Sequence, residues 1–122
     1  MVTPSEIATK YKNRECSICV QALCESFSGT VLKIDIQDIT PAKWRHIMHV
    51  SLSPNNSIST TGLHYAFLIN GTVYDNLHPS GVSRKEWSSN FLFLSANGSE
   101  ERITDIHISE MAIDVFLSEK NA

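Results

Sequence analysis

An Asn-Gly pair between two short apolar segments is the feature that most constrains how this chain can fold. Asn70 and Gly71 form the pair. It favours a type I′ turn, because both central residues of that turn need positive φ, and such a turn joins two antiparallel strands. The chain therefore predicts a β-hairpin centred on these residues, with Ile69 facing Thr72.

A histidine and an aspartate occupy matching places on the two strands of this hairpin. Counting outward from the turn puts Ala66 opposite Asp75, and His64 lies two residues before Ala66. Side chains alternate between the faces of a strand, so His64 and Asp75 share a face as diagonal neighbours, roughly 7 Å apart at Cα. A carboxylate at that position can orient an imidazole, as in Cys-His-acid and Ser-His-acid sites.

Two helices are predicted before the first strand. Residues 3–6 form a capping box, which starts a short helix that is expected to run to about Lys12. Asn13 is expected to cap a second helix, which continues to about Phe27 and ends at Gly29. The apolar residues of this second helix recur at spacings of three and four, which places them on one buried face.

Strands and further helices are predicted in the remainder of the chain. Before the hairpin we expect a strand over 30–36, a helix opened by Thr40 and Pro41 with Trp44, Ile47 and Met48 on its buried side, and a loop over 53–62. After the hairpin we expect a short helix that is capped by Ser83 and Glu86 and carries Trp87, and then a fully buried strand over 91–94. A turn at Asn97 and Gly98, a strand over 102–108 and a closing helix over about 110–119 complete the prediction. Helices followed by antiparallel strands indicate an α+β fold. The length of 122 residues fits a single domain, 1–122.

Composition and charge narrow the class of protein. Apolar residues make up 42% of the chain and charged residues 19%, an ordinary globular balance, and the formal net charge is −3. No apolar run is long enough to span a membrane, and the first residues lack a signal-peptide pattern. We therefore expect the protein in the cytoplasm of the producing or the target cell. If it is exported, we expect a larger carrier or a secretion system to deliver it. No basic run indicates nucleic-acid binding, although a local basic face stays open.

The three cysteines are clustered in one short segment, at Cys16, Cys19 and Cys24. This clustering does not suit a disulfide framework, so reduced thiols are expected. Cys16 falls in the first turn of the predicted second helix, where unpaired N–H groups and the helix dipole stabilise a thiolate or an oxyanion. With His64 and Asp75 it would form an arrangement for nucleophilic catalysis. Packing of all three cysteines in the core is the alternative.

Metal and redox sites are weaker interpretations of the same cysteines. Cys16 and Cys19 with His46 and His49 supply the ligand types of a zinc site, but their spacings differ from those of zinc fingers. A redox Cys-x-x-Cys of the thioredoxin type would follow a strand, whereas a helix precedes this one. We therefore expect no metal and no cofactor. The histidines outside the hairpin are expected on the surface or in loops: His46, His49, His78 and His107. Of these, His78 follows the hairpin and can reach the site.

Three segments, 13–23, 62–66 and 73–87, resemble the papain-fold toxin domains of bacterial polymorphic toxin systems, within the papain-like Cys-His superfamily. The resemblance extends from about residue 10 to residue 95, and 64–87 is its most specific part. It implies a papain-like fold in which N-terminal helices carrying the cysteine pack on a small antiparallel sheet carrying the histidine. It also implies delivery as part of a larger exported protein, a cognate immunity protein as inhibitor, and a role in bacterial competition.

The resemblance places the catalytic residues of that family on three positions of this chain. Its cysteine falls on Cys16, its histidine on His64 and its polar third residue on Asp75, with Asn76 as a less favoured third residue. The signature of papain proteases themselves would instead select Cys19 as the nucleophile. We favour Cys16, because the toxin families place their cysteine at the start of the helix.

These residues lead to one main function and two alternatives. The main prediction is a thiol-dependent hydrolase or transferase, in which Cys16 attacks an amide or acyl centre and His64 moves the proton. Proteases, deamidases and acyltransferases share this chemistry. The first alternative is a ribonuclease toxin that cleaves tRNA, and the second is a non-catalytic interaction module. The substrate is then a protein or a tRNA of the target cell. No residue matches the glutamine of the papain oxyanion hole, and Asn13 is the nearest amide upstream.

Overall fold

The computed structural model describes residues 2–39, 46–50, 57–94 and 99–120. The helices in these residues are α1 (Pro4–Ala8), α2 (Cys16–Ser26), α3 (Arg84–Ser89), α4 (Ile113–Lys120) and the short 3-10 helix η2 (Asp105–His107). The strands are β1 (Thr30–Asp35), β2 (Ile47–His49), β3 (Ser57–Ser59), β4 (Leu63–Ile69), β5 (Thr72–Asp75), β6 (His78–Ser83), β7 (Phe91–Leu94), β8 (Glu100–Arg102) and β9 (Ile108–Met111). The α+β class predicted from the sequence is confirmed.

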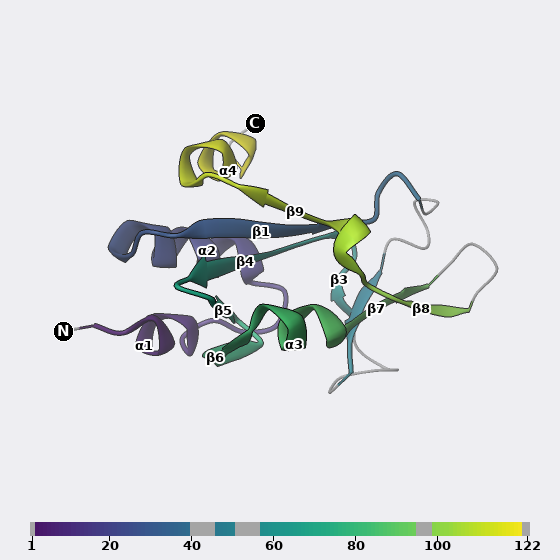
Figure 1. Cartoon of the computed structure of the whole chain (residues 1–122), viewed down its shortest axis with the longest axis horizontal. Helices are drawn as coiled ribbons and strands as arrows, with labels where there is room; N and C mark the ends of the chain where they lie inside the picture. Colours follow the sequence, from purple (N-terminus) through teal and green to yellow (C-terminus); the bar gives the residue numbers. More distant parts are fainter. Residues whose placement is uncertain (1, 40–45, 51–56, 95–98, 121–122) are drawn as a thin grey trace.

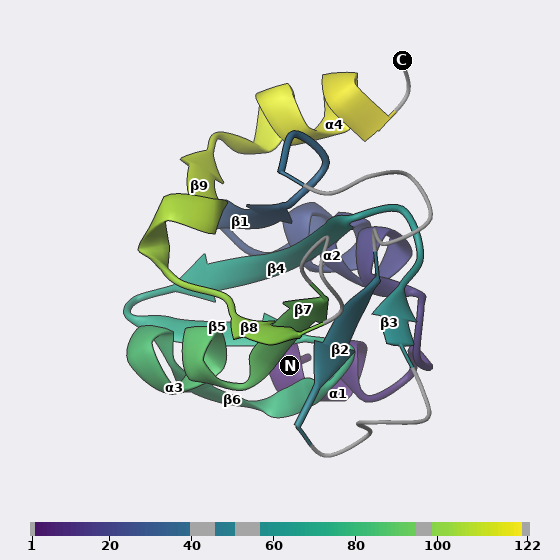
Figure 2. The same cartoon turned by 90° about the vertical axis from the view of Figure 1, so that its right-hand side faces the viewer.

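The strands form two antiparallel sheets (Figure 1). The larger sheet has the order β6-β5-β4-β1-β9, and the smaller sheet has the order β3-β2-β7-β8. In the turned view, the smaller sheet lies in front of the larger one, while α2 lies behind β4 (Figure 2). The helices α1 and α2 therefore cover one face of the larger sheet, and the smaller sheet covers the other.

Two clusters of buried side chains fill the spaces on either side of the larger sheet. One cluster lies between the two sheets and includes Leu32, Ile34, Ile47, Ala66, Trp87, Phe91 and Phe93. The other lies between the larger sheet and the helices and includes Ile7, Cys19, Val20, Leu23, Phe67 and Phe116. Because the residues of β1 and β4 alternate between the two clusters, both faces of these central strands are buried.

The predicted hairpin is confirmed. Asn70 and Gly71 have φ values of 49° and 85°, and Ile69 pairs with Thr72. β4 begins at Leu63, directly before the histidine of the hairpin. β5 (Thr72–Asp75) runs antiparallel to β4, so its last residue, Asp75, lies near the start of β4. The turn thus sets the register on which the site depends.

Replacing Gly71 is expected to destabilise the hairpin through the backbone alone. A Cβ at this position would meet nothing within 4 Å, so no steric clash adds to the effect. The positive φ of Gly71 is unfavourable for an L side chain, and we expect Gly71→Ala to lower the free energy of unfolding by about 1 to 2 kcal/mol. Thermal unfolding followed by circular dichroism measures this. Asn70→Gly is the matched control and should leave stability the same or higher, whereas an unchanged Tm for Gly71→Ala would contradict the argument.

The start of the second helix differs from the prediction. α2 begins at Cys16, with Glu15 rather than Asn13 as its N-cap. The prediction for Asn13 is wrong because its side-chain amide donates to the carbonyl oxygen of Ser57, at 3.3 Å, and does not cap the helix. The first helix also ends earlier than predicted, at Ala8.

The prediction of a helix after Thr40 is wrong for Ile47 and Met48, which lie in β2 and pair with β3 and β7. Residues 40–45, including Trp44, lie outside the described residues, as does the predicted turn at Asn97 and Gly98. β3 lies within the predicted loop over 53–62. β6 follows the hairpin and has no counterpart in the prediction. Such short strands form because of partners far along the chain, so local patterns miss them.

The C-terminal part also differs from the prediction. The single strand expected over 102–108 is wrong, because β8 ends at Arg102 and η2 follows before β9 begins at Ile108. The strand over 91–94 is confirmed, although only Phe91 and Phe93 are fully buried. The closing helix starts at Ile113, since the preceding residues pair with β1. Within the described residues, no helix has both the length and the apolar character needed to cross a membrane.

Candidate active site

His64 and Asp75 form the centre of the candidate site. His64 Nε2 and Asp75 Oδ2 are 2.9 Å apart, and both side chains are completely buried. The predicted diagonal pair of the hairpin is therefore a direct hydrogen bond. The contact leaves Nδ1 as the other polar atom of the ring, and this atom has no hydrogen-bond partner of regular geometry among the described residues.

Cys16 supplies the thiol that interacts with His64. It is the first residue of α2, and its thiol also accepts from the backbone N–H of Tyr65. Burial opposes ionisation of Cys16, but the positive charge and hydrogen bond of His64 outweigh it, so the pKa of the thiol lies below its ordinary value. Since Asp75 occupies Nε2, the thiol faces the Nδ1 side of the ring.

The charges of Cys16 and Asp75 act on His64 in return. Burial alone would lower the pKa of His64, yet the thiolate of Cys16 and the hydrogen bond to Asp75 raise it above the ordinary histidine value. The two shifts point in opposite directions, down for the thiol and up for the imidazole. Between the two pKa values, the pair is therefore a thiolate and an imidazolium.

The segment before α2 is tied to other parts of the fold, which sets the place of Cys16. Arg14 has a positive φ of 72°, an unfavourable conformation for a residue with a side chain. Its guanidinium donates to the backbone oxygen and the hydroxyl of Ser57 in β3, at 3.2 and 3.0 Å. Asn76 Nδ2 donates to the carbonyl oxygen of Lys12, at 2.7 Å. Asn76 thus holds the loop that carries Cys16, while Asp75 rather than Asn76 contacts the histidine.

Asp75 accepts hydrogen bonds on both of its carboxylate oxygens. Trp87 Nε1 donates to Oδ2 at 2.8 Å, beside His64. The other oxygen, Oδ1, accepts from the backbone N–H groups of Leu77 and His78, at 2.9 and 2.7 Å, and from His78 Nδ1, at 2.9 Å. The carboxylate therefore stays charged although it is buried, and its position is held from several directions.

A second histidine pair extends this network. His78 Nε2 lies 3.0 Å from His49 Nε2 and 3.0 Å from Asn90 Nδ2. The expectation that His49 and His78 lie on the surface or in loops is wrong: both are buried in strands, because β2 and β6 bring them against Phe91. His78 does reach the site, through Asp75.

Sequence reasoning missed the roles of Trp87, His49 and Asn90 at this site. The sequence predicts only that a short helix carries Trp87. The one signal for Trp87 in the sequence is its place as the fourth residue of a capped helix that closely follows the hairpin, since a buried indole N–H needs an acceptor. Nothing near His49 or Asn90 in the sequence indicates where they lie, because their strands are placed by long-range pairing.

Aromatic rings surround His64. The ring centroids of Phe91 and Trp87 lie 5.0 and 6.4 Å from that of His64. These rings exclude water from the side of the imidazole that faces the space between the sheets. Electrostatic interactions within the Cys16, His64 and Asp75 group are stronger in such surroundings than in water.

A pocket of about 210 Å³ opens beside Cys16. Its walls come from the start of α2, from β3 and the turn after it, and from β4: Arg14, Cys16, Ser17, Ile58, Ser59, Thr60, Thr61, Leu63 and Tyr65. Hydroxyl groups and one guanidinium thus line the pocket beside the thiol.

The other two cysteines differ from Cys16. Cys19 is completely buried in the cluster beneath α2, and burial followed by the charge of Asp75 raises its pKa to about 12. Burial also raises the pKa of Cys24 to about 11. In the part of the chain that the structure describes, no three His, Cys, Asp or Glu side chains are grouped so that they could hold a metal ion. The zinc set with His46 and His49 is not assembled, because Cys16 faces His64 instead.

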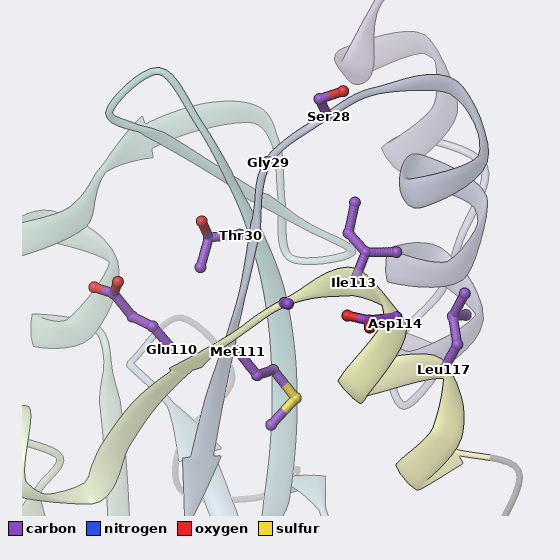
Figure 3. Close-up of a pocket in the computed structure, with 9 residues that line it drawn as sticks. Ser28, Gly29, Thr30, Glu110, Met111, Ile113, Asp114 and Leu117 are labelled. Atoms are coloured by element: carbon purple, nitrogen blue, oxygen red, sulfur yellow. The ribbon is translucent and has the colours of Figure 1, made fainter.

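A second pocket, of about 670 Å³, lies away from these residues. Figure 3 shows that Glu110 and Met111 of β9 and Ile113, Asp114 and Leu117 of α4 form it together with residues 28–30. Its walls include neither a histidine nor a cysteine, so the chemistry of the candidate site is confined to the pocket beside Cys16.

Comparison with known proteins places the chain in one family. Residues 2–92 match the model of the family described as papain fold toxin 2. This range includes α1, α2, both strands of the hairpin and the described residues that hydrogen-bond to the carboxylate of Asp75. No curated protein and no solved structure matches the chain.

Proposed function

This chain belongs to the papain fold toxin 2 family, and on that premise we propose that it is a toxin enzyme with Cys16 as its nucleophile. The substrates are amides or acyl esters, as in proteases, deamidases and acyltransferases. The observation that carries the proposal is the line of contacts from the Cys16 thiol through His64 to the carboxylate of Asp75. A thiolate, an imidazolium and an orienting carboxylate are the parts that thiol acyl transfer needs.

The proposed reaction has two steps. In the first, the thiolate of Cys16 bonds to the acyl carbon, and the leaving amine takes the proton of His64 as the carbon–nitrogen bond breaks. In the second, neutral His64 takes a proton from water or from an acceptor alcohol or amine. The resulting nucleophile displaces Cys16 and restores the thiolate. Asp75 keeps the imidazole in the tautomer and orientation that both steps use.

The start of α2 supplies groups for the negative charge that develops on the acyl oxygen. The first N–H groups of a helix have no acceptor within the helix. The side chain of the N-cap residue, Glu15, does not bond to them and instead accepts from the N–H of Lys12, at 2.6 Å. We therefore assign the oxyanion hole to the backbone at Cys16 and Ser17. This replaces the amide that sequence reasoning sought at Asn13.

The ribonuclease alternative is less well supported by the geometry. A ribonuclease would need His64 to reach the hydroxyl of a ribose. The imidazole is completely buried, and the group that acts on it besides Asp75 is the Cys16 thiol. Arg84, a basic residue that could contribute to an RNA-binding face, pairs with the carboxylate of Asp105 at 3.5 Å. Thiol chemistry therefore remains our proposal.

A cognate immunity protein as inhibitor and a macromolecular substrate in the target cell complete the proposal. We propose that the chain acts in the cytoplasm of the target bacterium, where thiols are kept reduced. Co-purification of the chain with the product of an adjacent gene tests the inhibitor. A chain that is equally toxic with and without that product would contradict the assignment.

The rate at which each cysteine reacts with iodoacetamide is expected to identify Cys16 without knowledge of the substrate. Because its pKa is lowered while those of Cys19 and Cys24 are raised to about 12 and about 11, Cys16 should be alkylated at the lowest pH. Mass spectrometry of the labelled protein across a pH series measures the three inflections. Above the raised pKa of His64 the imidazolium is lost, so catalytic activity should fall again at high pH.

His64→Gln is the control for this titration. It removes the positive charge that lowers the pKa of Cys16, so the inflection of Cys16 should move upward towards that of an ordinary buried thiol. An inflection of Cys16 at or above that of Cys24 in the unmodified protein would contradict the ion pair.

A further inference from the structure

Cys16 and Cys19 lie one turn apart on the same side of α2. Residues three apart on a helix are neighbours, with Cβ atoms about 5 to 6 Å from each other. Cys19 belongs to the buried cluster beneath α2, and Cys16 packs against the same cluster. Burial and then the negative charges of Asp75 and Cys16 raise the pKa of Cys19. A disulfide needs Cβ atoms about 4 Å apart. The first turn of α2 must therefore tighten by an ångström or two, and its N-cap side chain does not hold it.

The two thiols differ in their access to solvent. Cys16 lines the pocket of about 210 Å³, whereas Cys19 is completely buried in the cluster between α2 and the larger sheet. A small oxidant that enters the pocket therefore meets Cys16 first, and Cys19 is positioned to react with what forms there. Cys24 is two turns further along the helix, about 12 Å from Cys16 along the axis, which is too far for a bond between them.

We propose that Cys16 is a peroxide-reactive oxidation site and that Cys19 is its resolving cysteine. A disulfide between these two cysteines then blocks the nucleophile reversibly. The effect on activity rests on the proposed function of Cys16, but the oxidation chemistry does not. No other part of the site needs a free thiol at Cys19, and this buried thiol has no part in the acyl transfer described above.

The chemistry proceeds in two balanced steps. The thiolate of Cys16 attacks hydrogen peroxide, so that the O–O bond breaks and one oxygen bonds to sulfur as a sulfenic acid. The other oxygen leaves as hydroxide and takes the proton of His64 to become water. The thiol of Cys19 then attacks the sulfenic sulfur, which forms the disulfide and releases a second water. A thiol reductant then breaks the disulfide by thiol–disulfide exchange and restores both thiols.

The disulfide removes the thiolate that the proposed reaction uses, and an oxidising environment would therefore keep the protein inactive. Reduction in a cytosol, where glutathione and thioredoxin keep thiols reduced, would restore it. Oxidation to the disulfide also protects Cys16 from further, irreversible oxidation to sulfinic acid.

The test uses the 122-residue chain with Cys24→Ala, which leaves Cys16 and Cys19 unchanged and removes the third thiol. The purified protein is treated with hydrogen peroxide, quenched with iodoacetamide and examined by mass spectrometry. We expect the mass to fall by two hydrogen atoms with neither remaining cysteine alkylated, and dithiothreitol to restore both alkylation sites. If both thiols stay alkylatable, or if Cys16 gains oxygen atoms while Cys19 stays alkylatable, the proposal is overturned.

Cys19→Ser, a near-isosteric change, supplies the second arm in the same Cys24→Ala background. Without a resolving thiol, peroxide should carry Cys16 on to sulfinic acid, which dithiothreitol does not reverse. Protection of Cys16 in this variant equal to that in its parent would also overturn the proposal. These readouts are masses, so a failure of the proposed enzymatic function would appear separately, as toxicity that does not depend on Cys16.

Discussion

Bacteria that express Cys16→Ala are expected to grow as if no toxin were present. The substitution removes the atom that would bond to the acyl carbon, and loss of a nucleophile that acts as a unit with its base lowers turnover by a factor on the order of 10⁴ to 10⁶. Growth after induction, compared with induction of the unmodified chain, measures the effect. The change removes one sulfur atom from a half-buried position, so the fold should persist.

Cys24→Ala is the matched control for this experiment, since it makes the same change near the other end of α2. It should leave toxicity intact. Equal toxicity of Cys16→Ala and the unmodified chain would refute thiol catalysis. Discrete tRNA fragments in cells that express Cys16→Ala would then indicate the ribonuclease alternative. If neither Cys16→Ala nor His64→Ala altered toxicity, the chain would be a non-catalytic interaction module.

Asp75→Asn is expected to impair both activity and stability. The carboxylate orients His64, and loss of the corresponding aspartate in a comparable triad costs about 10⁴-fold in rate because the histidine takes the wrong tautomer. The amide also places an NH₂ group against N–H donors from His64, Trp87 or His78, so buried donors lose their acceptor. Breaking a buried charged network in this way costs about 3 to 5 kcal/mol.

The stability that Asp75 provides depends on pH in a defined direction. Burial raises the pKa of this carboxyl, but hydrogen bonds and charges from His64 and His78 outweigh burial and hold the pKa far below its ordinary value. A depressed pKa stabilises the folded state above the ordinary carboxyl pKa, and this contribution is lost as the pH falls towards the depressed value. Denaturant unfolding at neutral and at acid pH should therefore show a smaller difference between Asp75→Asn and the unmodified protein at acid pH.

Asp105→Asn is the matched control, because the Asp105 side chain is exposed and its ion pair is with Arg84 at the surface. Surface pairs of this kind contribute about 0 to 1 kcal/mol, so its unfolding free energy should hardly change. An Asp75→Asn protein as stable and as active as the Asp105→Asn protein would show that the network around Asp75 has no role in either property.

Much of the candidate site follows from local sequence signals. The Asn70 and Gly71 turn sets the register of β4 and β5, and side-chain alternation then brings His64 to Asp75. The position of Cys16 at a helix start was also predicted, although the cap residue was not. These features depend on residues close together in the sequence, where backbone preferences decide the conformation.

The surroundings of the site could not be obtained in this way. β2 and β6 place His49 and His78 behind Asp75, and β3 holds Arg14 ahead of Cys16, yet each strand is short and carries no periodic pattern. Their conformation depends on pairing with strands that are distant in the sequence. Packing against those partners, rather than local propensity, decides whether such a segment becomes a strand.

The sequence by itself determined the hairpin, the pairing of His64 with Asp75 and the placement of a cysteine in the first turn of a helix, because turn and helix-start preferences are local. Only the tertiary structure decided that Cys16 and not Cys19 faces the imidazole, and that Trp87 and His78 hold the carboxylate. Those contacts depend on how α2, α3 and the two sheets pack, and packing energies arise between residues that the sequence keeps far apart.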